Sequence, residues 1–364
     1  PLYMYANIVF PIASFRFFIY KIPPNLKGKL YNGCAVNVLF KNKLTIGYIE
    51  SIIKDSSYSG KIHTIKSIDK NQSISKDLWK TIIWMSNYYI APLGLCIKSA
   101  IPSFHYNPEN IKKDLYLQIN NNQLKHIKKH KFSKNQQLVI NELLNSREPL
   151  PAKYFASLIS NIYDVIKKLS ALKFINKLYI EPNNQEATEI RDSKLELSKA
   201  QLSIYNQIQP YLTKGQYKGF LIHGVPGSGK TEIYIQLAKE TISQGKNVII
   251  LIPEIILTTQ MKDRFLKYFG DSVAVWHSKM TLREKRYTLK RINDGGYNII
   301  IGARSSIFTS LPNIGLVVID EEQDSSYKQE SPKPYYNARD VGFIRALYAN
   351  CPIVLTSATP SLET

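Results

Sequence analysis

The sequence predicts an α/β protein of several domains: a small β-rich domain at the N-terminus, a short helical domain, and a parallel sheet with helices on both faces. Three observations support this. Apolar and β-branched runs separated by turns fill the first 105 residues, helical periodicity begins near residue 133, and apolar strands alternate with helical stretches from residue 197. The length of 364 residues suits two or three domains.

We place the boundaries where the composition changes. The expected segments are a β-rich domain at 1–105, a polar linker at 106–131, a helical domain at 132–180, a second polar linker at 181–196, and a parallel-sheet lobe at 197–364.

The β-rich domain contains two runs that predict a hairpin, AVNVLF at 35–40 and LTIGYI at 44–49, with Lys41, Asn42 and Lys43 between them. A helix is expected over 75–89, because Ser75 can cap it.

The helical domain begins with the segment 133–146, whose apolar side chains are expected near one face of a helix: Leu138, Ile140, Leu143 and Leu144. Further helices are predicted over 152–157 and 162–172, followed by a strand or hairpin at 173–181. Three helices and a β-wing in about fifty residues indicate a winged-helix domain. A plain three-helix unit without DNA contact fits the pattern equally well.

Five short apolar runs predict the strands of the lobe: 220–223, 248–252, 298–301, 316–319 and 353–356. Continuous apolar strands with helices between them are typical of a parallel sheet buried on both faces.

The composition favours a polyanionic partner. Lys and Arg number 48 against 28 Asp and Glu, a net charge of +20, and cations that meet phosphates release condensed counterions. A Lys-rich and Asn-rich proteome gives the same surplus.

The three cysteines form no CxxC pair, so neither a zinc site nor a disulfide framework is expected, which suits a reducing cytosol. No apolar run is long enough to predict a membrane span. The chain starts at Pro1 without an initiator methionine, which suits a chain incomplete at that end.

The sharpest motif is GVPGSGKT at 224–231, which follows a predicted strand and opens a predicted helix. Gly224, Gly227 and Gly229 let backbone amides surround phosphate oxygens. Lys230 can reach the β- and γ-phosphates of ATP, and Thr231 can offer its hydroxyl to Mg²⁺. A chance match in a loop is the alternative.

A second motif, DEEQ at 320–323, follows an apolar strand. We expect Asp320 to hold Mg²⁺ through water and Glu321 to orient and deprotonate the attacking water. An acidic helix start has the same appearance. A third motif, TSATP at 356–360, also follows a strand, and Ser357 and Thr359 are expected to report nucleotide state to the second motif. A turn that caps the next helix is its alternative.

These three motifs in this order resemble those of superfamily-two helicases. Neighbouring segments of the lobe resemble the PriA family of bacterial replication-restart helicases: 197–201, 229–234, 252–258, 277–278, 302–308, 324–330 and 335–340. Shorter matches lie in the N-terminal domain at 18–23, 33–38 and 88–102.

The resemblance implies a P-loop (RecA-like) helicase lobe, a winged helix and an N-terminal domain that binds the 3′ end of nascent DNA. It implies that Gln201 contacts adenine and that an aromatic-rich loop near 324–340 couples DNA binding to ATP hydrolysis. The expected DNA contacts, by base stacking or phosphate pairing, are Tyr327, Lys328, Tyr335, Tyr336, Arg339, Arg304, Phe18 and Tyr20.

Three positions depart from the family pattern. Gln323 stands where the family usually has His, so it can still hydrogen-bond toward the nucleotide or Ser357 but cannot protonate. Asn337 also stands where His is frequent. Ile19 replaces an Asp of some relatives, and it cannot accept a hydrogen bond from a 3′-hydroxyl.

The function implied by the resemblance is a 3′-to-5′ DNA helicase, dependent on ATP and Mg²⁺, that assembles the primosome at stalled forks in the bacterial cytoplasm, at the nucleoid. Forked and single-stranded DNA, primosome proteins and single-strand-binding protein are the implied partners, with no membrane. In the family a second lobe with an arginine finger, a zinc module and a C-terminal domain follow this point, so the chain as given is expected to hydrolyse ATP poorly and not to unwind DNA. A truncated, non-catalytic module for branched DNA, another superfamily-two translocase, and a P-loop ATPase that acts on proteins or small molecules are the alternatives.

Overall fold

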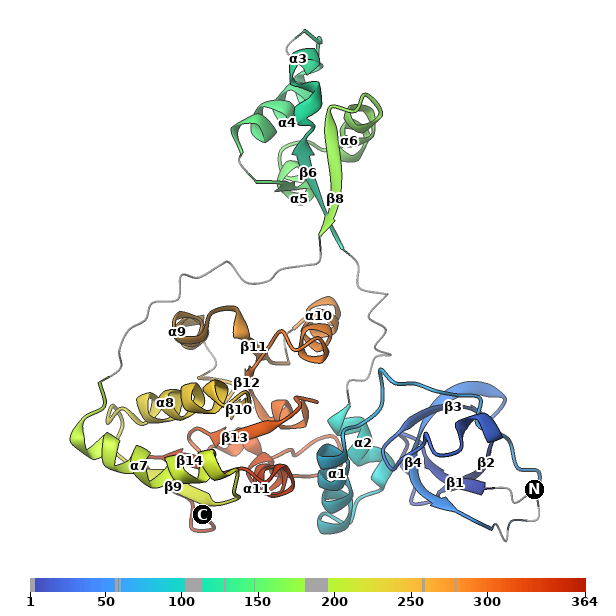
Figure 1. Cartoon of the computed structure of the whole chain (residues 1–364), viewed down its shortest axis with the longest axis vertical. Helices are drawn as coiled ribbons and strands as arrows, with labels where there is room; N and C mark the ends of the chain where they lie inside the picture. The colour runs from blue at the N-terminus through green and yellow to red at the C-terminus, as the bar shows by residue number, and fades with distance from the viewer. Residues whose placement is uncertain are drawn as a thin grey trace. The chain divides into compact units, whose positions relative to one another are not determined.

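The computed structural model describes residues 4–55, 58, 60–101, 113–127, 129–146, 148–180, 196–256, 259–278 and 280–364. The described residues form two compact units (Figure 1). One unit joins the N-terminal domain, 4–101, to the lobe, 196–364, and the other contains 113–180. The predicted α/β class, with a small antiparallel sheet and a parallel sheet, is confirmed.

The N-terminal domain is built on a five-stranded sheet in the order β2-β1-β4-β3-β5. Its strands are β1 (Met4–Val9), β2 (Phe18–Ile22), β3 (Ala35–Phe40), β4 (Lys43–Ile53) and β5 (Ser67–Ile68), with the 3-10 helix η1 (Pro24–Leu26) after β2. The predicted hairpin is confirmed as β3 and β4. Lys41 and Asn42 turn the chain with positive φ angles of 48° and 62°, a conformation that suits the twist of a two-residue hairpin.

Two helices follow this sheet, α1 (Lys76–Tyr88) and α2 (Leu93–Ala100). The first was predicted and the second was not, because Pro92 interrupts the pattern and α2 has only eight residues. Buried residues of both helices, including Trp79 and Ile97, share one hydrophobic core with Tyr48 of the sheet and with Val341 of the lobe. The N-terminal domain and the lobe are therefore packed together rather than tethered.

The second unit contains three predicted helices and a three-stranded sheet in the order β7-β6-β8. Its elements are β6 (Asp114–Ile119), η3 (Asn121–Gln123), α3 (Leu124–Ile127), α4 (Lys134–Asn145), β7 (Leu150–Pro151), α5 (Ala152–Ala156), α6 (Ile162–Ala171) and β8 (Ile175–Ile180). The linker expected over 106–131 is wrong from Asp114 onward, because β6 pairs along its whole length with β8. Leu144, expected near the buried face of α4, is 47% exposed, and Val139 is buried instead. The winged-helix assignment stays a prediction, and the second expected linker lies outside the described residues except for Glu196.

The lobe is a six-stranded parallel sheet in the order β11-β12-β10-β13-β14-β9. Its strands are β9 (Gly219–His223), β10 (Asn247–Leu251), β11 (Val273–Trp276), β12 (Ile299–Gly302), β13 (Ile314–Ile319) and β14 (Ile353–Ser357). Its helices are α7 (Lys199–Lys214), α8 (Lys230–Ser243), α9 (Thr259–Phe269), η4 (Gly270–Ser272), α10 (Leu282–Asn293), η5 (Arg304–Phe308), η6 (Ser325–Tyr327) and α11 (Ala338–Ala349). The edge strand β11 was not predicted, because four residues carry too little pattern.

Helices cover both faces of this sheet, as the continuous apolar strands require. Leu316 and Val318 of β13 pack in one core with α7, α8 and α9. Val317 and Ile319 pack in the other core, with α10, α11 and the N-terminal helices α1 and α2. No helix among the described residues is long and apolar enough to span a bilayer.

Candidate functional site

The three motifs meet because their strands are neighbours. The sheet order places β14 between β13 and β9, so DEEQ, TSATP and the glycine-rich loop all leave the carboxyl ends of adjacent parallel strands. The Gly224 amide donates to the Ser357 carbonyl at 3.1 Å, and the Glu322 amide donates to the Thr356 carbonyl at 3.0 Å. Such an edge is where open α/β sheets bind ligands.

The glycine-rich loop has the backbone that its motif predicts. Gly227 and Gly229 have φ angles of 78° and 80°, a region that side chains disfavour. The Lys230 side chain is only 8% exposed. Its Nζ donates to the Gly224 carbonyl at 2.7 Å and lies 3.9 Å from the Glu321 carboxylate. The loop therefore holds a buried ammonium between its own carbonyls and the second motif.

Asp320 is buried directly after β13 and is held by two hydroxyl groups. Its Oδ2 accepts from the Tyr234 hydroxyl at 3.0 Å, and its Oδ1 accepts from the Thr356 hydroxyl. Burial raises the pKa of the Asp320 carboxyl, and the hydrogen bonds from Thr356 and Tyr234 oppose that rise. The two hydroxyls thus help a buried carboxylate to remain ionised.

Tyr234 was missed as a functional residue, although it belongs to a segment that resembles the PriA family. It is fully buried on α8, one turn after Lys230. Its hydroxyl also hydrogen-bonds with Thr231, so one phenol joins both predicted magnesium ligands. Its position four residues after Lys230, on the same helix face, is the signal that could have revealed this role.

Gln323 joins the second motif to the third. Its Nε2 donates to the Glu321 carboxylate at 2.9 Å, and its Oε1 accepts from the Ser357 hydroxyl at 2.5 Å. The Ser357 hydroxyl in turn accepts from the Thr359 amide at 3.0 Å. The expected bond between Gln323 and Ser357 is therefore present in the structure.

Glu322 anchors a second network that sequence reasoning did not find. Its buried carboxylate accepts from Arg339 Nη1 at 3.2 Å, from the Thr364 hydroxyl at 2.7 Å and from the Ser361 amide at 2.7 Å. Despite burial, these hydrogen bonds lower the pKa of the Glu322 carboxyl. Arg339, expected to pair with DNA phosphate, is only 12% exposed and is held by this carboxylate.

Gln201, the expected adenine contact, lies against the glycine-rich loop. Its Nε2 donates to the Ser228 carbonyl at 3.1 Å, and its Oε1 accepts from the Ser198 amide in a capping box at the start of α7. Both ends of the amide are occupied, so contact with a base requires these bonds to exchange. The adenine role stays a prediction.

The aromatic loop, residues 324–337, is only partly available to a ligand. Tyr327 and Tyr336 are each 1% exposed. The Tyr327 hydroxyl donates to the Asp320 carbonyl at 2.6 Å, and the Tyr336 ring packs edge-on against Phe308. The expectation that these two rings stack on bases does not agree with this structure, because apolar packing has drawn them into the core. Tyr335 is 53% exposed and can still stack.

The two remaining basic candidates near this loop differ. Lys328 is exposed. Arg304 is half-buried, donates to the Lys328 carbonyl at 2.6 Å, and lies over the Tyr336 ring at 5.8 Å from its centroid. Arg304 therefore supports the loop in this structure.

The N-terminal candidates lie within the sheet. Tyr20 is 5% exposed and its hydroxyl donates to the Leu39 carbonyl at 2.8 Å. Phe18 is half-buried and packs edge-on against Phe10 and Phe40. Tyr20 is thus part of the core, whereas Phe18 and Ile19 are half-buried and keep part of their surface accessible.

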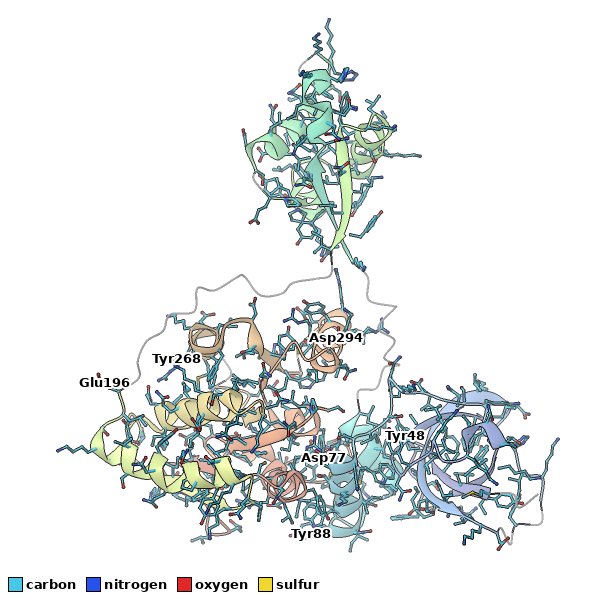
Figure 2. All side chains as sticks on the ribbon, viewed as in Figure 1. Tyr48, Asp77, Tyr88, Glu196, Tyr268 and Asp294 are labelled. Carbon is cyan, nitrogen blue, oxygen red and sulfur yellow. The ribbon has the colours of Figure 1, made fainter. Side chains whose placement is uncertain are left out.

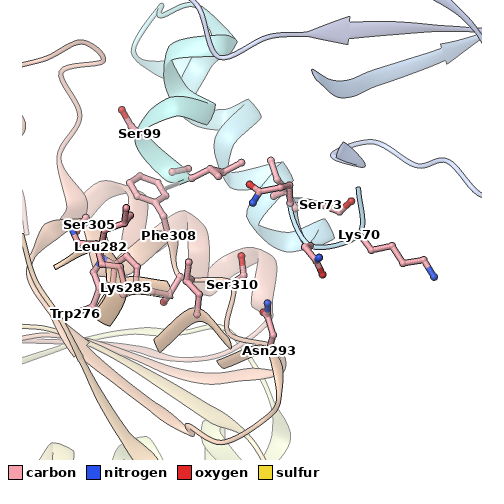
Figure 3. Close-up of a pocket in the computed structure, with 17 residues that line it drawn as sticks. Lys70, Ser73, Ser99, Trp276, Leu282, Lys285, Asn293, Ser305, Phe308 and Ser310 are labelled. Carbon is pink, nitrogen blue, oxygen red and sulfur yellow. The ribbon is translucent and has the colours of Figure 1, made fainter. Parts of the chain in front are cut away.

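A cavity of about 630 Å³ lies where the N-terminal domain meets the lobe (Figure 3). Lys70 and Ser99 of the N-terminal domain and Trp276, Lys285 and Phe308 of the lobe are among its lining residues. It shares no residue with the glycine-rich loop or with DEEQ, so it is separate from the motif site.

Two domain families match the two parts of the first unit. Residues 7–102 match the PriA family described as 3'DNA-binding domain (3'BD), and residues 198–364 match the DEAD/DEAH box helicase family. No group of three or more His, Cys, Asp or Glu among the described residues is arranged to bind a metal ion.

Three relatives illustrate the similarity. The Replication restart protein PriA of Chlamydia trachomatis is 32% identical over 374 residues, which cover 100% of this chain and 50% of the relative. That of Bacillus subtilis is 30% identical over 420 residues, with 96% and 52% covered. That of Synechocystis is 50% identical over 147 residues, with 40% and 18% covered.

This chain spans about half the length of the relatives that it matches along its whole sequence. A solved structure of RecG bound to a three-way DNA junction is 23% identical, with a TM-score of 0.36 over 46% of this chain and 21% of its own, a likeness too weak to add to the argument. The two domain matches and the similarity along nearly the whole sequence show that this chain belongs to the PriA family of replication restart proteins and contains a superfamily-two helicase lobe.

Proposed function

We propose that this chain contains the ATP-hydrolysing lobe and the 3′-end-binding domain of a 3′-to-5′ DNA helicase that restarts replication at stalled forks. The observation that carries the proposal is the meeting of Lys230, Asp320, Glu321 and Ser357 at the ends of three adjacent strands. Motors of this class need a phosphate-binding loop, a metal-binding carboxylate and a sensor at one edge.

The residues present fit ATP and Mg²⁺. Gly229 has a φ angle of 80°, which side chains disfavour, and a Cβ there would lie 2.2 Å from the Gln201 amide nitrogen, so glycine suits this turn of the loop. The start of α8 adds the partial positive charge that anions favour. The Thr231 hydroxyl and the Asp320 carboxylate supply the oxygen ligands that Mg²⁺ prefers, and Lys230 is placed to bind phosphate.

The chain's own residues then have distinct tasks. Bound Mg·ATP supplies the phosphoryl group that is transferred to water. Glu321 is the group that orients this water and accepts its proton. Gln323 holds one oxygen of Glu321 while accepting from Ser357, so a shift at the third motif displaces the base.

For DNA, we propose contacts at the exposed Tyr335 and Lys328 and at the sheet around Phe18 and Ile19, helped by the net charge of +20. Forked and single-stranded DNA are the proposed substrates. The names of the relatives support replication restart, and we propose primosome proteins and single-strand-binding protein as partners of the whole protein.

The test compares ATP binding and hydrolysis, with and without forked DNA, in wild type, Lys230→Ala and Glu321→Gln. We expect Lys230→Ala to weaken ATP binding about tenfold or more, because it removes a charge-assisted contact with phosphate. Glu321→Gln should keep ATP affinity but lose about a hundredfold or more in rate.

Lys214→Ala is the matched control, an exposed lysine at the end of α7 in the same lobe. It should behave as wild type. Hydrolysis that DNA leaves unchanged, or a Glu321→Gln variant as fast as wild type, would overturn the proposal.

A further inference from the structure

Tyr89 directly follows α1 in the N-terminal domain, but its hydroxyl belongs to the network of the lobe. It accepts from the Asn337 amide at 3.0 Å and donates to the Asp340 carboxylate at 3.1 Å. These partners lie 248 and 251 residues away in sequence. Burial raises the pKa of the phenol, so it remains a donor at physiological pH.

The contact falls at the junction where the aromatic loop becomes α11. Asn337 caps this helix by accepting from the Arg339 amide at 3.0 Å. Arg339 extends from the same turn to the Glu322 carboxylate. Only Ala338 therefore separates Asn337, whose amide is bound by Tyr89, from Arg339, which binds the DEEQ motif.

The surrounding packing fixes this contact in place. On the same pair of helices, Asp77 of α1 forms an ion pair with the fully buried Arg345 of α11, at 2.8 Å. Figure 2 shows Asp77 where α1 faces the lobe. Val9 and Tyr48 of the N-terminal sheet belong to the same core as α1. The sheet and α1 are thus packed as one body, a route by which a displacement of the sheet can reach Tyr89.

We propose that Tyr89 is a positioning residue through which DNA bound to the N-terminal domain sets the aromatic loop and the Arg339–Glu322 ion pair. The inference rests on the proposed function, since it assigns the N-terminal domain an influence on the hydrolytic motif. Two bonds to one hydroxyl make the link sensitive to the loss of a single oxygen atom.

The test is hydrogen exchange of the full chain, read in peptides that cover 335–340 and 320–323, with and without a forked duplex that carries a free 3′ end. The variant is Tyr89→Phe, which keeps the ring and removes the hydroxyl. Tyr88→Phe is the control, because this adjacent ring is 60% exposed. Thermal unfolding, fork affinity and ATP hydrolysis are measured in parallel.

We expect Tyr89→Phe to speed exchange at 335–340 by about tenfold, since the Asn337 amide loses its acceptor. The change that DNA causes in both peptides should disappear, and the stimulation of hydrolysis by DNA should fall about fivefold or more. Hydrolysis without DNA and fork affinity should stay within about twofold of wild type. Tyr88→Phe should match wild type throughout.

Two results overturn the inference. In the first, DNA changes the hydrogen exchange of both peptides in Tyr89→Phe as much as it does in wild type. In the second, DNA changes the exchange of neither peptide in wild type. Failure of the proposed function looks different. In that case wild type does not hydrolyse ATP even when DNA is present. A change in hydrogen exchange that depends on both DNA and Tyr89 would still support the positioning role.

Discussion

At the residue scale, neutral hydroxyl and amide groups hydrogen-bond to the charged groups of the site. Tyr234 donates to Asp320 and receives a bond from Thr231, and Gln323 bridges Glu321 and Ser357. A buried carboxylate needs such donors, because desolvation alone favours its protonated form. Tyr234, which lies outside the three motifs, therefore acts on the charge of a motif residue.

Tyr234→Phe tests this dependence. Removing the hydroxyl of Tyr234 takes one hydrogen-bond donor from Asp320, so the pKa of that carboxyl, already raised by burial, rises further. Because the proposed function needs ionised Asp320, the loss of ATP hydrolysis on acidification should begin at a higher pH than in wild type. At neutral pH the rate should fall by about tenfold.

The measurement is the pH profile of hydrolysis, with Tyr268→Phe on α9 as a control that leaves it unchanged. An unshifted acid limb in Tyr234→Phe would show that this hydroxyl does not tune Asp320.

At the element scale, α1 and α11 form the contact that makes the N-terminal domain and the lobe one unit. Apolar side chains dominate it, and the Asp77–Arg345 ion pair lies at its edge, with Arg345 fully buried and Asp77 28% exposed. Burial lowers the pKa of the Arg345 guanidinium, and Asp77 opposes this. The ion pair with Asp77 offsets the cost of burying the positive charge of Arg345.

Asp77→Ala should leave Arg345 buried without its counterion and destabilise the chain by about 2 kcal/mol, below the usual cost of breaking a buried pair because Asp77 is partly in water. The midpoint of thermal unfolding should fall by about 4–8 °C. Lys76→Ala, an exposed neighbour on the same helix, is the control. Equal midpoints for the two variants would mean that the apolar contact alone holds the helices together.

At the scale of the whole molecule, the net charge of +20 predicts how the chain binds DNA. Each cation set against a phosphate releases counterions, so binding that uses 6–10 phosphates weakens about 10³-fold or more between 50 and 200 mM salt. Recognition of a 3′ end uses short-range contacts that salt screens little.

We therefore expect fork affinity to fall steeply with salt, while the preference for a free over a blocked 3′ end stays constant. Titration of both forks at two salt concentrations measures this. If the preference for a free 3′ end decreases as salt rises, the preference comes from generic phosphate binding, and Ile19 does not contribute to it.

The sequence by itself determined the order of the elements, the five predicted strands of the lobe and the chemistry of the motifs. These features depend on periodicity and spacing within a few residues, as in GVPGSGKT at 224–231. The strand β6 escaped prediction because its partner β8 follows some sixty residues later. Short pairings of this kind have little local signature.

Only the tertiary structure decided which candidate side chains are free to meet a ligand. Tyr327, Tyr336 and Tyr20 have the composition of a DNA-binding surface but are buried, and Arg339 pairs with Glu322 rather than with phosphate. The contact of Tyr89 with Asn337 crosses 248 residues. Burial and long-range pairing arise from how whole elements pack, and no local pattern of residues encodes them.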